Sequence, residues 1–425
     1  MVKNILSGGG ISSPRRVLLI GAGIGQVELA HKIKKRGNFL ITVTLEGNCP
    51  VIGIADKVCY ENVFNLDAVL EIAKQERVDA VVSDQNDLMM PTVAYVAEHL
   101  GLPGNTFEQL QNYCDKNRFR GNCDRLGIKV PHHAAVHSEE ENPLQGVAFP
   151  WMVKPADSQS SVGVCRVDNE DEYKAAVKEA LRLSRHKEAI VEQFVRGSEI
   201  VSEGFIYHGR YYNLGYADRK YFELESLFIP SKTLFPSDAK DSVKQRIFDA
   251  EQKMASDIKP SFAIVHSEYL YDEKADEVYV VESALRGGGV YISSHLVPLY
   301  TGIDINELYL DCALCCERSV DEYLSQIAPK ASGYVCFCLP EGEVASIEGV
   351  ETIKRMPWVA KADIDNIKIG DKPQRVTHKG QRLGPVIVFG NDKDDLLEHI
   401  SIIQNTLRIG VRNSSGQYVG IDWGE

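Results

Sequence analysis

Hydrophobic and polar positions in the first hundred residues follow two periods. Short, continuously apolar runs predict buried strands, and segments with an apolar residue every three or four positions predict helices. The runs lie at 16–20 (RVLLI), 39–46, 57–60 and 79–84, and the helical segments at 27–37, 66–76 and 92–100. Strands that alternate with helices indicate a parallel sheet covered on both faces. The sequence therefore predicts an α/β domain over residues 15–112, after a flexible N-terminus of residues 1–14.

The pattern changes after Leu102-Pro103-Gly104-Asn105, and we expect a second domain over residues 113–310. One helix is predicted over Thr106–Gly127, and paired β-type runs predict hairpins. The hairpins lie at 150–167, 206–213 and 262–284. With a helix from Asn169 to about Arg185, the first of them gives a small lid of about residues 131–196.

The last part of the chain predicts an α+β domain over residues 311–425. A strand is expected over Gly333–Leu339 and a final helix over Asp392–Leu407. No motif with a chemistry of its own appears there. The fold class expected for the whole chain is thus α/β and α+β.

Composition limits the classes of function. The chain has 425 residues, of which 44% are hydrophobic and 25% charged, and it contains no apolar run of the roughly 18 residues that a membrane span needs. The N-terminus lacks the apolar core of a signal peptide, so we expect a cytoplasmic protein without a membrane partner. A net charge of −13 argues against nucleic acid as a partner. Association into a homodimer is left open.

Ten cysteines are spread over this long chain, and we expect free thiols rather than a disulfide framework. Cys312, Cys315 and Cys316 lie close together, but no second Cys or His pair at zinc spacing accompanies them. The prediction for this cluster is packing in the core.

A glycine turn, Gly21-Ala-Gly23-Ile-Gly25-Gln26, follows the first strand. Gln26 stands where a dinucleotide-binding turn needs its last glycine, so NAD is not expected as a ligand. Ser83 and Asp84 end a later strand, where α/β sheets place ligand contacts and where a helix cap is equally suitable.

The loop from Lys154 to Val164 (KPADSQSSVGV) joins two β-type runs and contains only small and polar residues near its tip. Ser160 and Ser161 can offer hydroxyls and backbone N–H groups to phosphate oxygens, with Lys154 as a point charge at the strand end. A solvated hairpin loop explains the same composition.

Spacing suggests a metal site in the hairpin of residues 262–284. A turn centred near Ala275 pairs residues whose numbers sum to about 550, which sets Glu268 opposite Glu282. Two facing carboxylates repel unless a cation lies between them, and Mg²⁺ (or Mn²⁺) prefers such oxygen ligands. A register slip of one residue would separate the two acids.

The Lys154 loop resembles that of the ATP-grasp superfamily, in which D-alanine–D-alanine ligases carry a Lys-Pro run followed by Ser-Ser-Val-Gly. The glycine turn is similar to the domain that precedes the ATP-binding core in biotin carboxylases and carbamoyl-phosphate synthases. The resemblance implies that ATP and Mg²⁺ are the cofactors. It assigns to nucleotide binding Lys116, Lys154, Ser160, Ser161, Val162, Glu192, Gln193, Val195 and Glu199. Within this set, Glu192 would face the adenine and Glu199 the ribose; taken without the resemblance, both are ordinary surface acids, and Lys116 is an exposed lysine.

The same resemblance implies catalytic residues. Lys220, preferred over Arg219, would contact the transferred phosphate, and Arg286 with Gly287–Gly289 would hold a carboxylate and its acyl-phosphate. The stretch Ser231–Asp241 is expected to be an active-site loop. Relatives often read Glu-x-Asn-x-Arg where this chain has Ala284 in place of the Asn, so Ser283 or water would have to replace a third metal ligand.

Three functions follow as hypotheses. The first is an ATP-dependent ligase that joins a small-molecule carboxylate, such as an amino acid, to an amine through an acyl-phosphate. The second is a phosphotransferase, or an enzyme with carbamoyl-phosphate-synthase-like chemistry, on the same scaffold. The third is a nucleotide-binding module without turnover.

Overall fold

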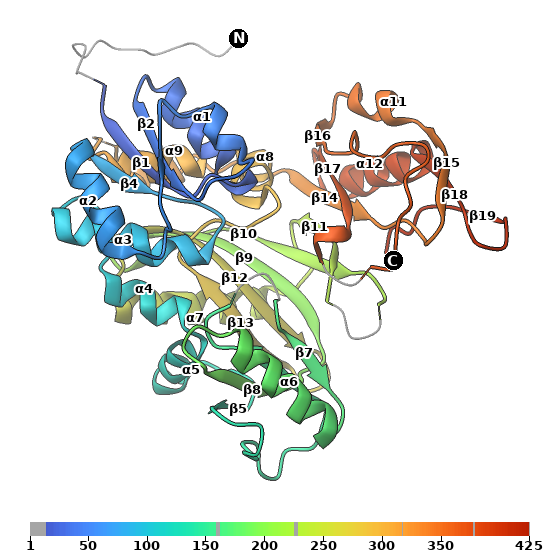
Figure 1. Cartoon of the computed structure of the whole chain (residues 1–425), viewed down its shortest axis with the longest axis horizontal. Helices are drawn as coiled ribbons and strands as arrows, with labels where there is room; N and C mark the ends of the chain where they lie inside the picture. The colour runs from blue at the N-terminus through green and yellow to red at the C-terminus, as the bar shows by residue number, and fades with distance from the viewer. Residues whose placement is uncertain (1–13, 159–161, 225–227, 317, 377–378, 425) are drawn as a thin grey trace.

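The structure is a computed structural model, and it describes residues 14–158, 162–224, 228–316, 318–376 and 379–424. Figure 1 shows three lobes: the N-terminal domain in blue, the lid in green below it, and the C-terminal part in orange and red to one side. A long central sheet runs between them.

The N-terminal lobe confirms the predicted parallel sheet, in the strand order β3-β2-β1-β4. Its strands are β1 (Arg16–Ile20), β2 (Phe39–Thr44), β3 (Lys57–Tyr60) and β4 (Ala80–Val82). Its helices are α1 (Val27–Lys35), α2 (Leu66–Glu76) and α3 (Met90–Leu100), with short 3-10 turns at Ile24–Gln26, Pro50–Gly53 and Asp87–Met89. The apolar residues of β1, and those of β2 after Phe39, are buried, which is why the runs are continuous in the sequence.

The central sheet has eight strands in the order β13-β12-β9-β10-β11-β14-β17-β16. They are β9 (Ser198–Tyr207), β10 (Arg210–Tyr221), β11 (Pro230–Phe235), β12 (Phe262–Asp272), β13 (Glu277–Ala284), β14 (Ala331–Phe337), β16 (Val359–Ala362) and β17 (Leu383–Gly390). Because β11 begins at Pro230, the prediction of a loop over Ser231–Asp241 is wrong for its first half: the polar residues there lie in a strand, with Ser231 and Thr233 buried.

The C-terminal part contributes three strands to this same sheet, because β11 pairs with β14. The other elements of this part are a small sheet of β15 (Glu343–Glu348), β18 (Arg408–Arg412) and β19 (Tyr418–Val419), with α11 (Val350–Lys354), a 3-10 turn at Lys379–Gln381 and α12 (Lys393–Thr406). Along the chain, α7 (Asp241–Ile258) lies between β11 and β12. Between β13 and β14 lie a π-helical turn at Ile292–Leu296, α8 (Val297–Thr301), α9 (Ile305–Ala313) and α10 (Val320–Leu324).

The lid is a four-stranded antiparallel sheet with one helix. It contains β5 (His133–Val136), β6 (Trp151–Pro155), β7 (Cys165–Val167), β8 (Ala189–Gln193) and α6 (Glu170–Leu183), in the strand order β5-β8-β6-β7. The predicted hairpin is confirmed, since β6 pairs with β7.

The structure has two helices where the sequence predicted one. The segment Thr106–Gly127 forms α4 (Phe107–Cys114) and α5 (Lys116–Arg125), separated by Asp115 in an extended conformation. The Asp115 carboxylate accepts a hydrogen bond from the backbone N–H of Arg118 at 2.9 Å, so it caps a new helix instead of continuing the first. This break places Lys116 in the first turn of α5.

All ten cysteines are free thiols, as predicted. Core packing is wrong for Cys315 and Cys316, which are exposed after the end of α9, and Cys312 is half-buried. Over the ranges that the structure describes, no helix is both long and apolar enough to cross a bilayer.

Candidate functional site

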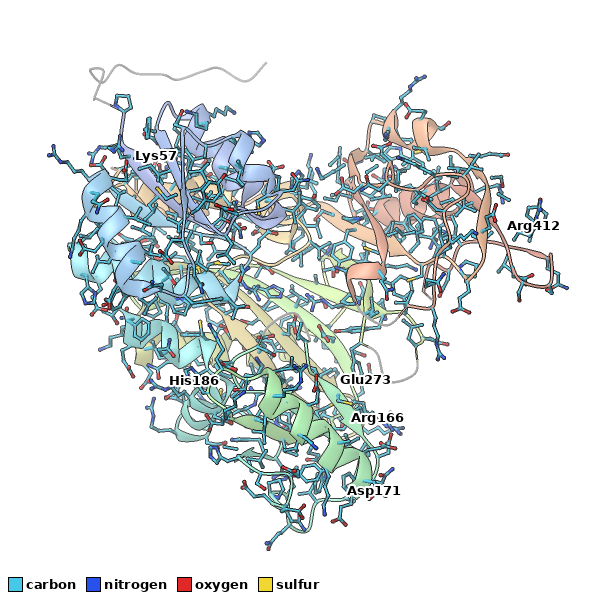
Figure 2. All side chains as sticks on the ribbon, viewed as in Figure 1. Lys57, Arg166, Asp171, His186, Glu273 and Arg412 are labelled. Carbon is cyan, nitrogen blue, oxygen red and sulfur yellow. The ribbon has the colours of Figure 1, made fainter. Side chains whose placement is uncertain are left out.

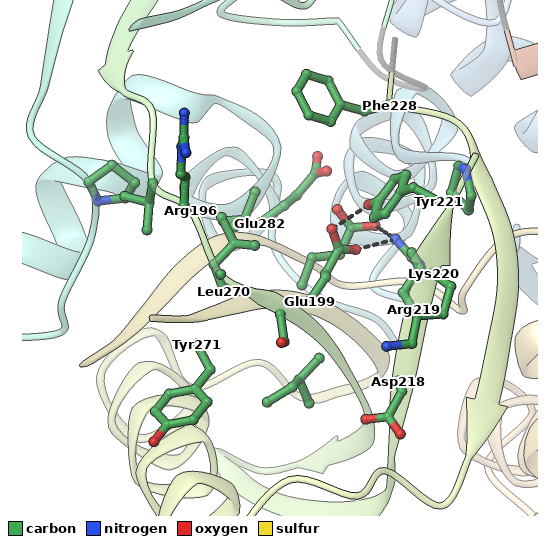
Figure 3. A pocket seen from close by; sticks show the side chains of 18 of the residues that line it. Arg196, Glu199, Asp218, Arg219, Lys220, Tyr221, Phe228, Leu270, Tyr271 and Glu282 are labelled. Atoms are coloured by element: carbon green, nitrogen blue, oxygen red, sulfur yellow. Dashed lines mark hydrogen bonds and ion pairs between the residues drawn. The ribbon is translucent and has the colours of Figure 1, made fainter. Parts of the chain in front are cut away.

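A cavity of about 1020 Å³ is lined by the lid on one side and the central sheet on the other. Figure 3 shows part of its wall, including Glu199, Arg219, Lys220 and Glu282. Most residues predicted for the site line this cavity: Lys116, Lys154, Glu192, Gln193, Val195, Glu199, Lys220, Glu268 and Glu282. Arg166 of β7 and Glu273 of the β12–β13 turn, both labelled in Figure 2, line it as well. Val162, which is 52% exposed, and Arg286 are not among its lining residues. Ser160 and Ser161 lie outside the described residues.

Lys154 and Glu192 meet on one face of the lid sheet. Glu192 on β8 is opposite Met152 on β6, so Lys154, two residues further along β6, points to the same side. Its Nζ lies 2.5 Å from Glu192 Oε2, and Arg120 Nε of α5 lies 2.6 Å from Glu192 Oε1. Burial alone would raise the pKa of Glu192, but the charges of Arg120 and Lys154 outweigh it and lower this pKa to about 2. Glu192 is therefore a buried anion held between two cations.

Arg120 was not identified from the sequence. It lies one helical turn after Lys116 on α5, and its Nη2 also donates to the carbonyl of Val281 on β13 at 2.7 Å. It thereby links the lid acid Glu192 to the strand that carries Glu282. The sequence signal that could have identified Arg120 is its i,i+4 spacing from Lys116, which places both basic side chains on one face of a helix.

Lys116 is hydrogen-bonded to the first part of the Lys154 loop. Its Nζ donates to the carbonyl of Ser158 at 2.5 Å, and its backbone N–H donates to the carbonyl of Ala156 at 3.1 Å. Ser158 Oγ donates to the carbonyl of Val162 at 2.8 Å across the loop. The amine of Lys116 thus lies at the base of the loop, at the cavity wall.

Carboxylates and one arginine gather on one face of the central sheet. Glu268 is opposite Glu282, so the predicted register is confirmed. Arg219 Nη1 lies 2.8 Å from Glu199 Oε1 and forms a second ion pair with Glu268, while the Tyr221 hydroxyl donates to Glu199 (Figure 3). Burial raises the pKa of Glu199, and Arg219 offsets this only in part. At Glu268, Arg219 and His266 outweigh burial and lower the pKa.

The structure places Arg219, and not Lys220, in this cluster of acids. Successive residues of a strand point to opposite faces, so Lys220 is turned away from Glu199 and Glu268, and it is exposed where Arg219 is 9% exposed. Lys220 still borders the cavity further along.

The donor set at Glu268 and Glu282 suits Mg²⁺. In the described part of the chain there is no group of three or more His, Cys, Asp or Glu side chains arranged to hold a metal ion. Mg²⁺ is commonly bound by one or two carboxylates and completes its octahedron with water and nucleotide phosphates. Two facing carboxylates at the wall of a large cavity fit that mode, and Ala284 offers no side-chain ligand.

Arg286 is anchored in the N-terminal domain. Its Nε and Nη2 lie 3.0 and 2.8 Å from the two carboxylate oxygens of Asp87, a bidentate pair. Burial would lower the pKa of Arg286, but Asp87 outweighs it and the pKa is raised. The guanidinium is fixed in one orientation with a counterion on one edge.

The expectation that Gly287–Gly289 present exposed amides to a carboxylate is wrong for Gly287. The Gly287 N–H donates to Asp84 Oδ1 at 2.9 Å, and Ser293 Oγ donates to Asp84 Oδ2 at 3.0 Å. A Cβ at Gly287 would lie 2.3 Å from Ser293 Oγ, so the close approach requires glycine. Asp84, 1% exposed, therefore anchors the loop after β13, and in the described residues it caps no helix.

Comparisons with known proteins agree with this fold. Residues 124–203 match the family described as D-Ala-D-Ala ligase C-terminus, and residues 336–412 match L-amino acid ligase C-terminal domain 2. The chain is an ATP-grasp protein.

Relatives of this ATP-grasp chain include the alanine–anticapsin ligase of Bacillus subtilis, 25% identical over 280 residues, which cover 60% of this chain and 58% of that protein. The formate-dependent phosphoribosylglycinamide formyltransferase of Saccharolobus solfataricus is 22% identical over 91% of this chain and 95% of its own length. Among solved structures, an L-amino acid ligase from Bacillus licheniformis has the same fold, with a TM-score of 0.78 at 21% identity over 95% of this chain and 100% of that one.

The ATP-grasp core of this chain also borders a second cavity, of about 310 Å³, which sequence reasoning missed. Lys116, Ser158 and Glu282 line both cavities. The walls of the second one come from the N-terminal domain, with Asp87 and Phe64, and from the lid side, with Asp157 and Arg185. The Arg185 guanidinium lies over the Phe64 ring, 4.6 Å from the ring centroid. Residues from segments this far apart leave no local sequence pattern.

Proposed function

We propose that this chain is an ATP-dependent carboxylate–amine ligase that forms an amide through an acyl-phosphate. One observation carries the proposal: Lys116 and Glu282 stand in the wall between a nucleotide-sized cavity and a smaller cavity. Such a wall allows a phosphoryl group to pass from a ligand on one side to a ligand on the other. The names of the ligases among its relatives support the same reaction class.

The large cavity would hold ATP. Lys116 and Lys154 would neutralise phosphate charge, Gln193 and Val195 would offer backbone groups to the adenine, and Glu199 would accept the ribose hydroxyls. Glu268 and Glu282 would hold Mg²⁺ or Mn²⁺, which when bound screens the phosphate charge and polarises the transferred group. Arg219, already bonded to Glu199 and Glu268, takes the role that the sequence assigned to Lys220.

The small cavity would hold the carboxylate substrate beside Asp87, which lines this cavity and is paired with Arg286. The γ-phosphoryl group moves to a carboxylate oxygen, giving ADP and an acyl-phosphate. The amine then attacks the carbonyl carbon, the C–O bond to phosphate breaks, and the amine loses a proton as the amide forms. Arg286, fixed by Asp87, would stabilise negative charge on the acyl-phosphate and on the tetrahedral adduct.

The substrates proposed are small: an amino acid or similar carboxylate, and an amine. A cavity of about 310 Å³ lies at the lower limit for small-molecule sites, which suits one amino acid and excludes a folded partner. The proposal places the protein in the cytoplasm, where ATP and free amino acids are available. A homodimer stays a hypothesis that a measurement of molecular mass in solution would test.

The test is a screen of amino acids in pairs, with ATP and Mg²⁺, for release of ADP and phosphate. Mass spectrometry of the products should find an amide, and Glu282→Gln should abolish its formation. A product that retains the phosphate would replace the ligase with a phosphotransferase. Nucleotide binding without ADP release for any pair would favour a module without turnover.

A further inference from the structure

A buried acid–imidazole pair lies on the central sheet beside the two metal-site acids. Glu203 of β9 is opposite His266 of β12, and His266 is two residues from Glu268 on the same face. The Glu203 side chain is fully buried and His266 is 4% exposed. Neither residue lines the nucleotide cavity, and the proposed reaction assigns no role to them.

The imidazole connects two carboxylates. Its Nδ1 is hydrogen-bonded to Glu203 Oε1, and its Nε2 lies 3.4 Å from Glu268 Oε1. A carboxylate only accepts hydrogen bonds, so the ring nitrogen that faces it acts as the donor. Glu203 Oε2 has no hydrogen-bond partner within the described residues, so its bond to His266 is the contact that holds this buried acid.

The surroundings hold the ring in place. A Cβ on Gly288 would lie 2.6 Å from Glu203 Oε1 and 2.8 Å from His266 Nδ1, so the loop after Arg286 packs directly on the pair. On the other side, the residue opposite His266 in β13 is Ala284, whose small side chain leaves room for the imidazole.

We propose that His266, held by Glu203, is a positioning residue that orients Glu268 for the divalent cation. This inference rests on the proposed function, because it takes Glu268 as a metal ligand. His266 and Arg219 both bond Glu268 Oε1, and among the described residues no hydrogen bond reaches Oε2. The two bonds thus fix the carboxylate while Oε2 stays available for the cation. Removal of such outer partners typically weakens metal binding by about 10- to 100-fold.

Two substitutions of His266 distinguish the contributions of its two ring nitrogens. The amide nitrogen of Gln occupies the place of Nε2 and can still donate to Glu268, whereas that of Asn occupies the place of Nδ1 and reaches only Glu203. We therefore expect His266→Gln to bind the cation within about threefold of the wild type, and His266→Asn to bind it about 10- to 100-fold more weakly.

A matched control is Tyr269→Phe. Tyr269 follows Glu268 on β12, is 1% exposed, and donates to the buried acid Glu251 at 2.6 Å on the opposite face. The Tyr269→Phe variant loses one buried hydrogen bond on the same strand, and this bond does not involve Glu268. Its cation affinity should therefore equal that of the wild type.

The measurement is the signal of free Mn²⁺ in electron paramagnetic resonance, with protein titrated in the presence of a non-hydrolysable ATP analogue. Equal affinity for His266→Asn and the wild type overturns the inference, and so does a loss shared by Tyr269→Phe. If His266→Asn fails to fold, a loss of more than about tenfold in His266→Gln still overturns it. A wild type that binds no Mn²⁺ with the nucleotide contradicts the proposed function itself.

Discussion

At the scale of single residues, the charged side chains of the cavity are already paired before a nucleotide enters. Lys154 is bonded to Glu192, and Arg219 to Glu199 and Glu268. A triphosphate must therefore compete with Glu192 for the amine of Lys154. Arg120 makes this exchange less costly, because Glu192 keeps one cation when Lys154 turns to the phosphates.

The Glu192 pair predicts a pH dependence of stability. The folded-state pKa of Glu192 is about 2, below its ordinary value of 4.5, so its stabilisation is present above about pH 4.5 and is lost as the pH falls towards 2. The shift corresponds to roughly 3 kcal/mol. We expect Glu192→Gln to be less stable than the wild type at about pH 6, and the difference to shrink by about pH 3. Urea unfolding at both pH values measures it, and a difference that does not change with pH would contradict the assignment.

Arg219 and Lys220 can be distinguished by kinetics. Arg219→Lys keeps the charge but cannot bond Glu199 and Glu268 together, so kcat/KM for ATP should fall by about 10- to 100-fold. Lys220→Ala should change it by less than about threefold, since this amine faces away from the acids. A larger loss of kcat/KM for Lys220→Ala than for Arg219→Lys would instead support the role that the sequence assigned to Lys220.

The limits of sequence reasoning are visible in these residues. The β-type runs and the turn at Ala275 were enough to predict that Glu268 faces Glu282. The choice between Arg219 and Lys220 depends on which of them lies on the same face of the sheet as Glu199, and that is set by the pairing of β10 with β9 rather than by composition. Arg120 escaped prediction because Glu192 is 72 residues away in the chain, and the contact of Asp84 with Gly287 was missed because 203 residues separate them.

At the scale of elements, the loop after β13 is held by the N-terminal sheet. Asp84, at the end of β4, accepts hydrogen bonds from Gly287 N–H and from Ser293 Oγ. The strand-end position of Asp84 was predicted, but its partner lies in another domain, so the sequence favoured a ligand or a helix cap. Similarly, the break between α4 and α5 depends on one capping carboxylate in a helical pattern.

Asp84→Asn tests this anchor. The amide keeps the volume but replaces one acceptor by a donor, which then faces the donors Ser293 Oγ and Asn306 Nδ2. The loop that carries Arg286 should loosen, so kcat should fall by about tenfold or more while the dissociation constant of an ATP analogue stays within about threefold. Calorimetry and steady-state kinetics measure the two effects. A parallel loss of nucleotide affinity would show that Asp84 acts on the whole fold.

At the scale of the whole molecule, the predicted α+β segment 311–425 and the ATP-grasp core share one sheet. The sequence predicted one strand of this segment, over Gly333–Leu339, and a loop where β11 lies. The pairing of β11 with β14 joins segments almost one hundred residues apart, and no local pattern records it. The buried side chains agree with the pairing, because Leu234 of β11 packs in one cluster with Val335 and Val386.

Truncation before β14 therefore gives a clear expectation. A chain that ends at Pro329 would leave β11 as an unpaired edge and expose buried side chains on both faces of the sheet, Leu234 on one and Phe235 on the other. We expect this truncated chain to aggregate or to melt more than about 10 °C below the full chain, because several buried apolar side chains of about 1.5–3 kcal/mol each lose their packing. Light scattering and thermal unfolding of both chains measure this. A truncated chain that stays monomeric, melts within about 3 °C of the full chain and still binds an ATP analogue would show that segment 311–425 folds as an independent domain.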